Sequence, residues 1–228
     1  MLERAEAFGK HLFHHWGDRS VVHVHLGRLG VFLHAPPPAP APRPQVRMRV
    51  AGSRLVADLV APAICARIDA AGRRQVVAAL GPDPLREDAD PGVAIERLTG
   101  RDAPVGALLL DQSVLSGVGN VLRAEALFLC GISPARPGSS LSRDEAYALW
   151  RTLARLMREA VDDGRILTRV PAGADRRLVA EHETRFVYRQ ERCRRCGTRV
   201  ARGTIGGRTS WACPRCQPVL RGRGTRAW

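Results

Sequence analysis

Four cysteines in two Cys-x-x-Cys pairs limit how the carboxyl-terminal part of the chain can fold. Cys193 and Cys196 form the first pair, and after sixteen residues Cys213 and Cys216 form the second. Four thiolates at this spacing satisfy a tetrahedral zinc ion, and two disulfides or a redox pair are the alternative. Residues 188–228 would then be a small separate module that has too little core to fold without its metal.

The sequence between the two cysteine pairs is typical of a β-hairpin. Gly206-Gly207 is a two-residue turn signal, with strand-forming residues on either side. Arg208, directly after the turn, would be a rigidly presented cation that suits contact with a phosphate. An ordinary solvated arginine is the alternative, because the chain has 35 arginines.

The overall charge favours a polyanionic partner. The 228 residues include those 35 arginines and one lysine against 22 acidic side chains, which gives a formal net charge of +14. Nucleic acid is the leading polyanion for such a chain, and an arginine-rich proteome is the alternative explanation. No apolar run approaches the roughly 20 residues that cross a bilayer, and no charged-then-apolar leader opens the sequence. We therefore expect a cytoplasmic protein that binds nucleic acid and no membrane.

The single lysine, Lys10, is a candidate functional residue. Arginine can replace lysine where only a solvated charge is needed, but an amine that loses its proton can act as a nucleophile, an acid or a base. Lys10 lies in the segment Phe8-Gly9-Lys10-His11, which we expect at the start of a strand. Chance is the alternative, since one lysine must fall somewhere.

Six of the seven histidines cluster between residues 11 and 34. The strand period of two predicts that His23 and His25 share one face, and that His11 and His15 share another. A metal site is conceivable, but the cluster contains one carboxylate and no cysteine. We interpret these histidines as the polar faces of half-exposed strands.

Hydrophobic periodicity predicts three regions. Residues 1–60 alternate as β-strands do, and residues 61–165 carry largely helix-forming sequence. A capping box, Ser142 with Glu145, marks the start of one helix, and residues 166–187 read as a linker. We expect an α+β multidomain chain with domains at residues 1–90, 91–187 and 188–228.

A glycine-rich turn precedes one of the predicted helices. Gly117-Val118-Gly119-Asn120 leads into a helix over residues 121–129. Glycines let backbone amides point outward at a helix start, and that geometry binds phosphate. A tight connection between two helices is the alternative.

Taken in order, these motifs resemble those of the formamidopyrimidine-DNA glycosylase and endonuclease VIII family of bacterial base-excision repair enzymes. The resemblance runs from Leu2 to about Gln217. It rests on Gly9-Lys10-His11-Leu12, His25-Leu26-Gly27, Gly81-Pro82-Asp83-Pro84-Leu85, Leu109-Leu110-Asp111-Gln112, Gly117-Val118-Gly119-Asn120 and the four-cysteine module. It implies an incomplete N-terminal β-sandwich, a helix-two-turn-helix domain and a C-terminal zinc-finger β-hairpin. It also implies one structural Zn2+ and a monomer that binds double-stranded DNA with an oxidised base or an abasic site.

The resemblance implies roles for five residues. Lys10 would contact the phosphate beside the lesion and help proton transfer. Arg208 would grip the DNA backbone and assist elimination, and Asn120 would bind a phosphate at the start of its helix. Arg28 and Leu29 would fill the gap that an everted base leaves, because a damaged base must leave the stack before it can be excised.

The first residues depart from the family's pattern. The family's nucleophile is an N-terminal proline followed by glutamate, whereas this sequence opens with Met1-Leu2-Glu3. The match also begins inside the family's first domain, after its first strands and a helix, and Glu3 has neighbours that match an internal strand. Two explanations remain open, a start codon further upstream and a truncated gene.

We therefore expect a DNA glycosylase and abasic-site lyase that works through a Schiff base and β- or δ-elimination, with impaired activity in the chain as written. Lys10 could supply a substitute amine for slow lyase activity. The alternatives are a catalytically inactive protein that binds damaged DNA and a zinc-ribbon adaptor for protein partners. The adaptor would explain the four cysteines, but neither Lys10 nor the glycine turn.

Overall fold

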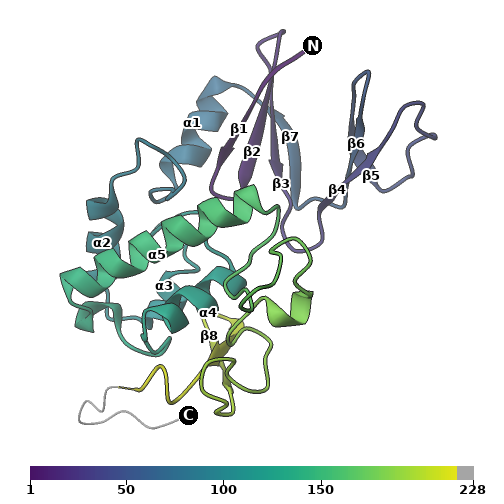
Figure 1. Cartoon of the computed structure of the whole chain (residues 1–228). Helices are drawn as coiled ribbons and strands as arrows, with labels where there is room; N and C mark the ends of the chain where they lie inside the picture. Colours follow the sequence, from purple (N-terminus) through teal and green to yellow (C-terminus); the bar gives the residue numbers. More distant parts are fainter. Residues whose placement is uncertain (220–228) are drawn as a thin grey trace. The chain divides into compact units, whose positions relative to one another are not determined.

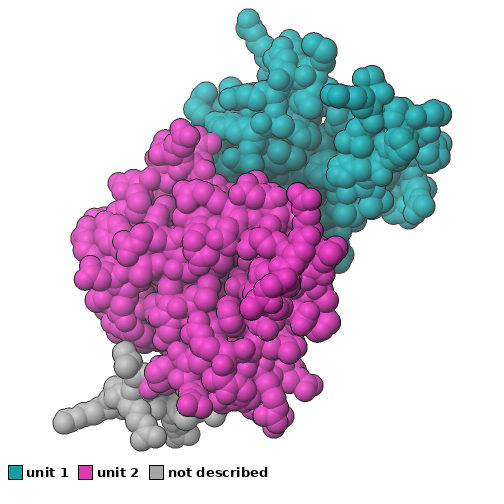
Figure 2. Space-filling view, in the orientation of Figure 1, with its two compact units in different colours: residues 1–79 teal, residues 80–228 magenta. Residues whose placement is uncertain are grey.

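Two compact units make up the chain, Met1–Ala79 and Leu80–Trp228 (Figure 2). The structure is a computed structural model that describes residues 1–219, so the last part of the predicted module at residues 188–228 lies outside the described residues. Among the described residues, no helix combines the length and the apolar character that a membrane span requires.

The first unit contains seven strands in two antiparallel sheets (Figure 1). One sheet has the order β1-β2-β3-β7, with β1 at Leu2–Phe8, β2 at His11–Trp16, β3 at Val21–His25 and β7 at Ile64–Ile68. The other has the order β4-β6-β5, with β4 at Val31–Ala35, β6 at Val56–Val60 and β5 at Val46–Ala51. Strand β7 corrects the expectation that helical structure begins at residue 61. Its five residues, ICARI, pair along their full length with β3.

Both sheets of the first unit contribute buried apolar side chains, and in the β1-β2-β3-β7 sheet these lie on both faces. Phe13 and Leu59 are fully buried, and Val24 is 1% exposed. Helix α1 (Ala70–Ala78) begins where the Asp69 carboxylate accepts a hydrogen bond from the Gly72 amide, and it packs against β3 and β7. An aspartate N-cap of this kind accepts a hydrogen bond from a first-turn amide that has no acceptor within the helix.

The register of β2 and β3 puts histidines on a common face. His11 pairs with His25, and Phe13 pairs with His23. Residues directly opposite one another in an antiparallel pair point to the same face of the sheet. The expectation that His11 and His15 occupy a different face from His23 and His25 was therefore wrong, because the period of two predicts faces within a strand but not between strands.

The second unit is helical at its start and carries the cysteines at its end. Its helices are α2 (Pro91–Thr99), α3 (Val105–Leu108), α4 (Asn120–Leu129) and α5 (Arg143–Asp162), and its hairpin strands are β8 (Ala201–Ile205) and β9 (Arg208–Ala212). Short 3-10 helices lie at Gly138–Ser140 and Glu181–Glu183. The predicted capping box of α5 is confirmed: the Glu145 amide donates to Ser142 Oγ, and the Ser142 amide donates to the Glu145 carboxylate.

Two hydrophobic clusters hold the second unit together. The larger one packs α2, α3, α4 and α5 around Leu109, Leu127 and Leu149. The smaller one joins Phe128 of α4 to Trp211 of the hairpin and to two of the cysteines. The helices and the hairpin are thus packed together within the second unit. The compact units divide after Ala79, and the domain limits expected after residues 90 and 187 stay a prediction.

The predicted linker over residues 166–187 is pinned to the helices. Glu125 of α4 is fully buried, and its carboxylate accepts hydrogen bonds from the backbone amides of Phe186, Val187 and Tyr188 at 2.7–2.9 Å. The Thr168 hydroxyl donates to the same carboxylate at 2.6 Å. A buried charge needs this many donors, so the segment is fixed although it has no periodic pattern.

Candidate nucleic-acid interface

The four cysteines of the second unit gather in one site. Their sulfur atoms all lie within 4.8 Å of one another, and Cys196 Sγ is 3.5 Å from Cys213 Sγ and 3.6 Å from Cys216 Sγ. A tetrahedral zinc ion with Zn–S bonds of about 2.3 Å requires sulfur separations of about 3.8 Å. Within residues 1–219, this is the one group of three or more His, Cys, Asp or Glu side chains that could hold a metal ion.

The chemistry of these four donors also fits a cation. Burial raises the pKa of the Cys216 thiol to about 12 and raises that of Cys193, whereas a hydrogen bond with the Thr198 hydroxyl lowers the pKa of Cys196 to about 6. Thiolates this close repel one another, so all four can ionise together only around a positive charge. The residues that the sequence predicted as zinc ligands therefore suit a divalent metal in both distance and charge.

The hairpin between the cysteine pairs presents Arg208 beside a tight turn. Gly206 and Gly207 both have positive φ, 60° and 68°, as a two-residue turn of this type requires. Ile205 pairs with Arg208, and Arg208 is exposed directly after the turn. The predicted turn is confirmed.

The amino terminus of α4 is open to an anion. Its N-cap is Gly119, and no side chain caps the amides of its first turn. Gln112 braces the preceding turn: its side-chain amide donates to the carbonyls of Leu110 and Val118, and its oxygen accepts from the Gly117 amide. Uncapped amides at a helix start form a ready anion site.

Asn120, the first residue of α4, contacts the hairpin. Its side-chain nitrogen donates to the Thr209 carbonyl at 3.0 Å, while its side-chain oxygen is buried and has no hydrogen-bond partner among the described residues. The structure thus brings Asn120 next to the residue that follows Arg208. Two candidate phosphate contacts that lie 88 positions apart in the sequence belong to one surface of the second unit.

Sequence reasoning missed Arg123, which donates to the hairpin carbonyls beside this surface, and Glu125, which binds residues 186–188. Both are fully buried in α4. Their signal was available, because they interrupt the apolar stretch Val121–Leu129 with two opposite charges on a helix that packs on several sides. A charge inside such a helix needs dedicated partners.

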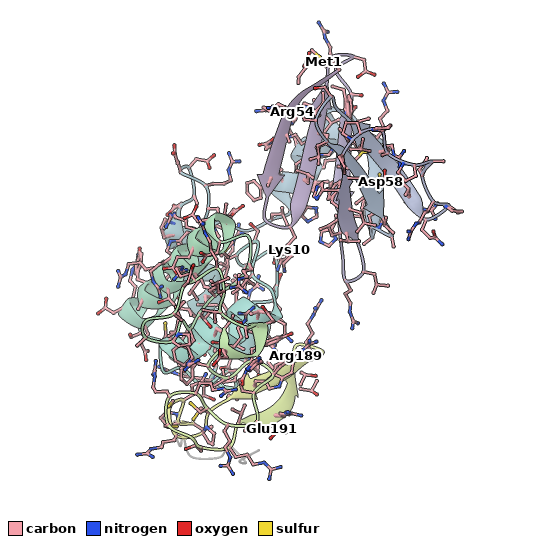
Figure 3. The ribbon with its side chains drawn as sticks, turned by 45° about the vertical axis from the view of Figure 1, so that its right-hand side comes forward. Met1, Lys10, Arg54, Asp58, Arg189 and Glu191 are labelled. Atoms are coloured by element: carbon pink, nitrogen blue, oxygen red, sulfur yellow. The ribbon has the colours of Figure 1, made fainter. Side chains whose placement is uncertain are left out.

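Lys10 lies in the turn between β1 and β2, directly before the residue at which β2 begins. Phe8 pairs with His11, so Gly9 and Lys10 form a two-residue connection, and Gly9 has a positive φ of 56°. Glycine readily adopts the positive φ that such a turn requires. Lys10 is exposed at one end of β1, and Met1 lies at the other end (Figure 3).

An imidazole cluster begins next to Lys10. His11 Nδ1 and His23 Nε2 are 2.8 Å apart, and the rings of His11 and His25 are centred 4.8 Å apart. Burial, followed by the charges of the neighbouring histidines and Lys10, lowers the pKa of His11 to about 4. Burial also lowers the pKa values of His23 and His25. These histidines are therefore neutral at physiological pH.

Arg28 and Leu29 project from the loop between β3 and β4. This loop is tight, because the Gly30 amide donates to the Leu26 carbonyl and a Cβ at Gly30 would lie 2.4 Å from that oxygen. Leu29 is 82% exposed, and Arg28 is exposed as well. Since β2 and β3 are antiparallel, this loop and Lys10 lie at the same end of the sheet.

Comparison with known proteins identifies the family. Residues 80–171 match the formamidopyrimidine-DNA glycosylase H2TH domain, and this match starts at the first residue of the second unit. The chain is 43% identical to "Endonuclease 8 1" of Mycobacterium tuberculosis over 226 residues, which cover 95% of this chain and 84% of the relative. It is 40% identical to a formamidopyrimidine-DNA glycosylase of Geobacillus kaustophilus over 149 residues, or 64% of this chain and 54% of that protein.

Solved structures share the fold. Lactococcus lactis formamidopyrimidine-DNA glycosylase, bound non-covalently to DNA with an AP site, matches with a TM-score of 0.78 and 22% identity over 96% of this chain and 82% of that one. The same enzyme in complex with DNA that contains FAPY-dG matches with a TM-score of 0.78 and 21% identity over the same shares. The predicted β-sandwich and helix-two-turn-helix architecture is confirmed. With a close relative along nearly its whole length, the chain belongs to the formamidopyrimidine-DNA glycosylase and endonuclease VIII family.

Proposed function

We propose that this protein is a base-excision-repair enzyme that binds duplex DNA at oxidised bases or abasic sites and acts as a DNA glycosylase and abasic-site lyase. The names of its relatives support this class of activity. The observation that carries the proposal is the surface of the second unit on which Asn120, the open start of α4 and the Arg208 hairpin meet. Uncapped amides and a rigid arginine are the groups that bind adjacent phosphates of a DNA strand.

Each site residue has a proposed task on the DNA. Asn120 and Arg208 bind backbone phosphates, and Lys10 binds the phosphate beside the lesion. Arg28 and Leu29 enter the helix where the damaged nucleotide has left the stack, for which a tight loop with an 82% exposed leucine is suited. The four cysteines hold one structural Zn2+, which supplies no reacting group and keeps the hairpin folded. We propose a monomer that works on chromosomal DNA in the bacterial cytoplasm.

The lyase reaction requires an unprotonated amine. At an open abasic site, C1′ of the sugar is an aldehyde carbon, and an amine adds to it with loss of water to form an imine. Loss of a C2′ proton then expels the 3′ phosphate, and hydrolysis of the imine returns the amine. Before that hydrolysis, loss of a C4′ proton from the conjugated imine would expel the 5′ phosphate.

We propose further that base excision is weak in the 228-residue polypeptide and that Lys10 supplies the amine for slow lyase activity. The polypeptide opens with Met1-Leu2-Glu3, whereas the resemblance implies a reacting proline. Strand β1 separates Met1 from Lys10, and its seven residues span roughly 20 Å. Met1 and Lys10 thus lie at opposite ends of β1. A protein that binds damaged DNA without catalysis is the alternative.

Borohydride trapping tests both proposals. Parent, Lys10→Arg and Lys10→Ala are incubated with a duplex that contains one abasic site, and both strand nicking and covalent adducts are measured on gels. Lys10→Arg is the matched variant, because it keeps the cation but provides no reactive amine. Arg54→Ala, on the exposed turn between β5 and β6, is the control for a lost surface charge.

We expect an adduct in the parent and the control, and at least about tenfold less in Lys10→Arg with DNA affinity retained. Equal trapping by Lys10→Ala would show that another amine reacts. Tight binding by the parent with neither nick nor adduct would establish the non-catalytic alternative.

A further inference from the structure

Arg123 is a fully buried cation whose hydrogen-bond partners are all neutral. Its guanidinium donates to three backbone carbonyls, those of Gly106 at 3.3 Å, Ile205 at 2.9 Å and Thr209 at 2.7 Å. No carboxylate forms an ion pair with it anywhere in the described part of the chain. Burial and the nearby charge of Arg208 lower its pKa to about 10, so it remains protonated at neutral pH. An uncompensated buried charge is costly, and a fold keeps one where it has a task.

The three carbonyls explain where that charge is used. Ile205 and Thr209 lie on either side of the turn, so Arg123 holds the hairpin immediately before Gly206 and immediately after Arg208. Gly106 belongs to α3, against which the turn packs, because a Cβ at Gly206 would lie 3.2 Å from Ala107. One side chain thus joins α4, α3 and the hairpin turn. A planar guanidinium can make this three-way connection, and a lysine amine cannot reproduce its fork.

The same carbonyl also serves Asn120. Thr209 accepts hydrogen bonds from both Arg123 Nη2 and Asn120 Nδ2. The orientation of the Asn120 amide and the position of the Arg208 backbone are therefore fixed from one point. Both proposed phosphate contacts depend on a residue that is itself fully buried and cannot touch a phosphate.

We infer that Arg123 is a positioning residue: it locks the hairpin turn onto the start of α4, so that Asn120 and Arg208 meet the DNA backbone as one preset surface. This inference rests on the proposed function, because it concerns how the same surface binds DNA. Preset geometry raises affinity, since the ordering of the two elements is not left to the moment of binding. Removal of Arg123 should therefore act on DNA affinity through Arg208.

A double-mutant cycle in the full chain tests this. Arg123→Met, Arg208→Ala and the double variant are compared with the parent for affinity toward a duplex that carries a tetrahydrofuran abasic analogue, over a range of salt concentrations. Zinc content and thermal unfolding are measured on every variant. Arg123→Lys keeps the charge without the fork and provides a milder variant if Arg123→Met does not fold. Arg136→Met is the matched control, because Arg136 is a largely buried arginine of the same unit whose side chain binds Ser140 and Glu145 instead of the hairpin carbonyls.

We expect Arg123→Met to weaken binding by about tenfold in the parent background and by less than about threefold when Arg208 is already alanine. The slope of log affinity against log salt concentration should be shallower by about one phosphate contact in Arg123→Met, although Arg123 itself reaches no phosphate. A general loss of stability would not produce either result, and Arg136→Met should combine additively with Arg208→Ala. A folded, zinc-loaded Arg123→Met or Arg123→Lys that binds like the parent, or that weakens binding equally in both backgrounds, would overturn the inference. A parent that fails to bind the duplex would instead refute the proposed function.

Discussion

Glu125 and Arg123 lie two positions apart in α4, and each orders a different segment of the second unit. Arg123 binds carbonyls of the hairpin, and Glu125 binds amides of residues 186–188. Neither charge is neutralised by an opposite charge at hydrogen-bond distance within the described chain. Backbone carbonyls and amides form the hydrogen bonds that both charges need once they are buried. Each buried charge therefore holds one segment of the chain against α4.

The first prediction concerns Glu125. In Glu125→Gln, one carboxylate oxygen becomes an amide nitrogen that faces backbone amides or the Thr168 hydroxyl. Hydrogen bonds to the charged acceptor are lost, and a buried donor is left without a partner. We expect the free energy of unfolding to fall by about 3 kcal/mol. Chemical denaturation measures this.

Glu159→Gln is the control for that prediction, because Glu159 is one-third exposed and pairs with Arg155 on the surface of α5. Its expected cost is about 0.5 kcal/mol or less. Equal losses in the two variants would mean that the amides of residues 186–188 do not depend on Glu125.

At this scale, the sequence was informative wherever a residue type has few alternatives. Four cysteines in paired spacing predicted their own cluster, and two adjacent glycines predicted the hairpin turn. Arg123 and Glu125 stand out in the sequence as two charges within an apolar helical stretch, but the sequence does not show which groups they bind. Their partners are backbone atoms up to 86 positions away, which only the tertiary fold brings near.

Among the elements, the β8–β9 hairpin depends most on something other than its own sequence. Two strands of five residues each are marginal alone. Strand β9 leads directly to Cys213, while Cys193 and Cys196 precede β8. A metal that joins the two pairs would close the module across the hairpin and, through Arg123 and Asn120, hold the base of the proposed DNA surface.

The second prediction is therefore that loss of zinc unfolds the hairpin and weakens the affinity for DNA. We expect one zinc per chain by elemental analysis, and none in Cys213→Ser. Affinity for abasic duplex should fall at least about tenfold in that variant, because a structural zinc commonly contributes about 10 kcal/mol or more to folding of its module. Cys65→Ser, which alters a half-buried cysteine of the first unit, is the matched control and should retain zinc and affinity. A hairpin that stays folded without metal, by amide chemical shifts, would contradict the prediction.

Helices, strands and turns could be predicted from the sequence where the residues that stabilise them are close together in the chain. The capping box of α5 lies within four consecutive residues, and the structure confirmed it. Strand β7 was missed because its five residues are strand-like only once β3 offers an edge. Residues 166–187 have a linker-like sequence, because their order comes from the carboxylate of Glu125 on α4 and not from a local pattern.

At the scale of the whole molecule, the two units differ in the kind of ionisable side chain that they bury. The second unit has buried ionic groups solvated by backbone, whereas the first has a face lined with imidazoles. Burial lowers the pKa values of His11, His14, His23 and His25, so these side chains ionise at a lower pH in the folded protein than in an unfolded chain. The folded first unit is therefore expected to be more stable at neutral pH than in acid.

The third prediction is that acid destabilises the first unit. An unfolded histidine binds its proton near pH 6.5, whereas folded His11 does so near pH 4. Between these values the unfolded state holds more protons, so stability is constant above about pH 6.5 and falls as the pH drops toward 4. Each such histidine adds a slope of up to about 1.4 kcal/mol per pH unit. Glu6, whose pKa is lowered chiefly by its hydrogen bond with Arg73, adds to the loss at still lower pH.

Unfolding free energies measured from pH 8 to 4.5, together with histidine C2–H shifts in NMR titrations, test this prediction. His11→Gln removes one imidazole from the cluster and should make the slope between pH 6.5 and 4.5 shallower by up to one proton. His34→Gln alters an exposed histidine on β4 and should leave the profile of the parent in place. A His11 resonance that titrates near pH 6.5, or a slope that is the same in both variants, would mean that the cluster does not exclude protons. The acid sensitivity of the molecule would then have to arise from its carboxylates.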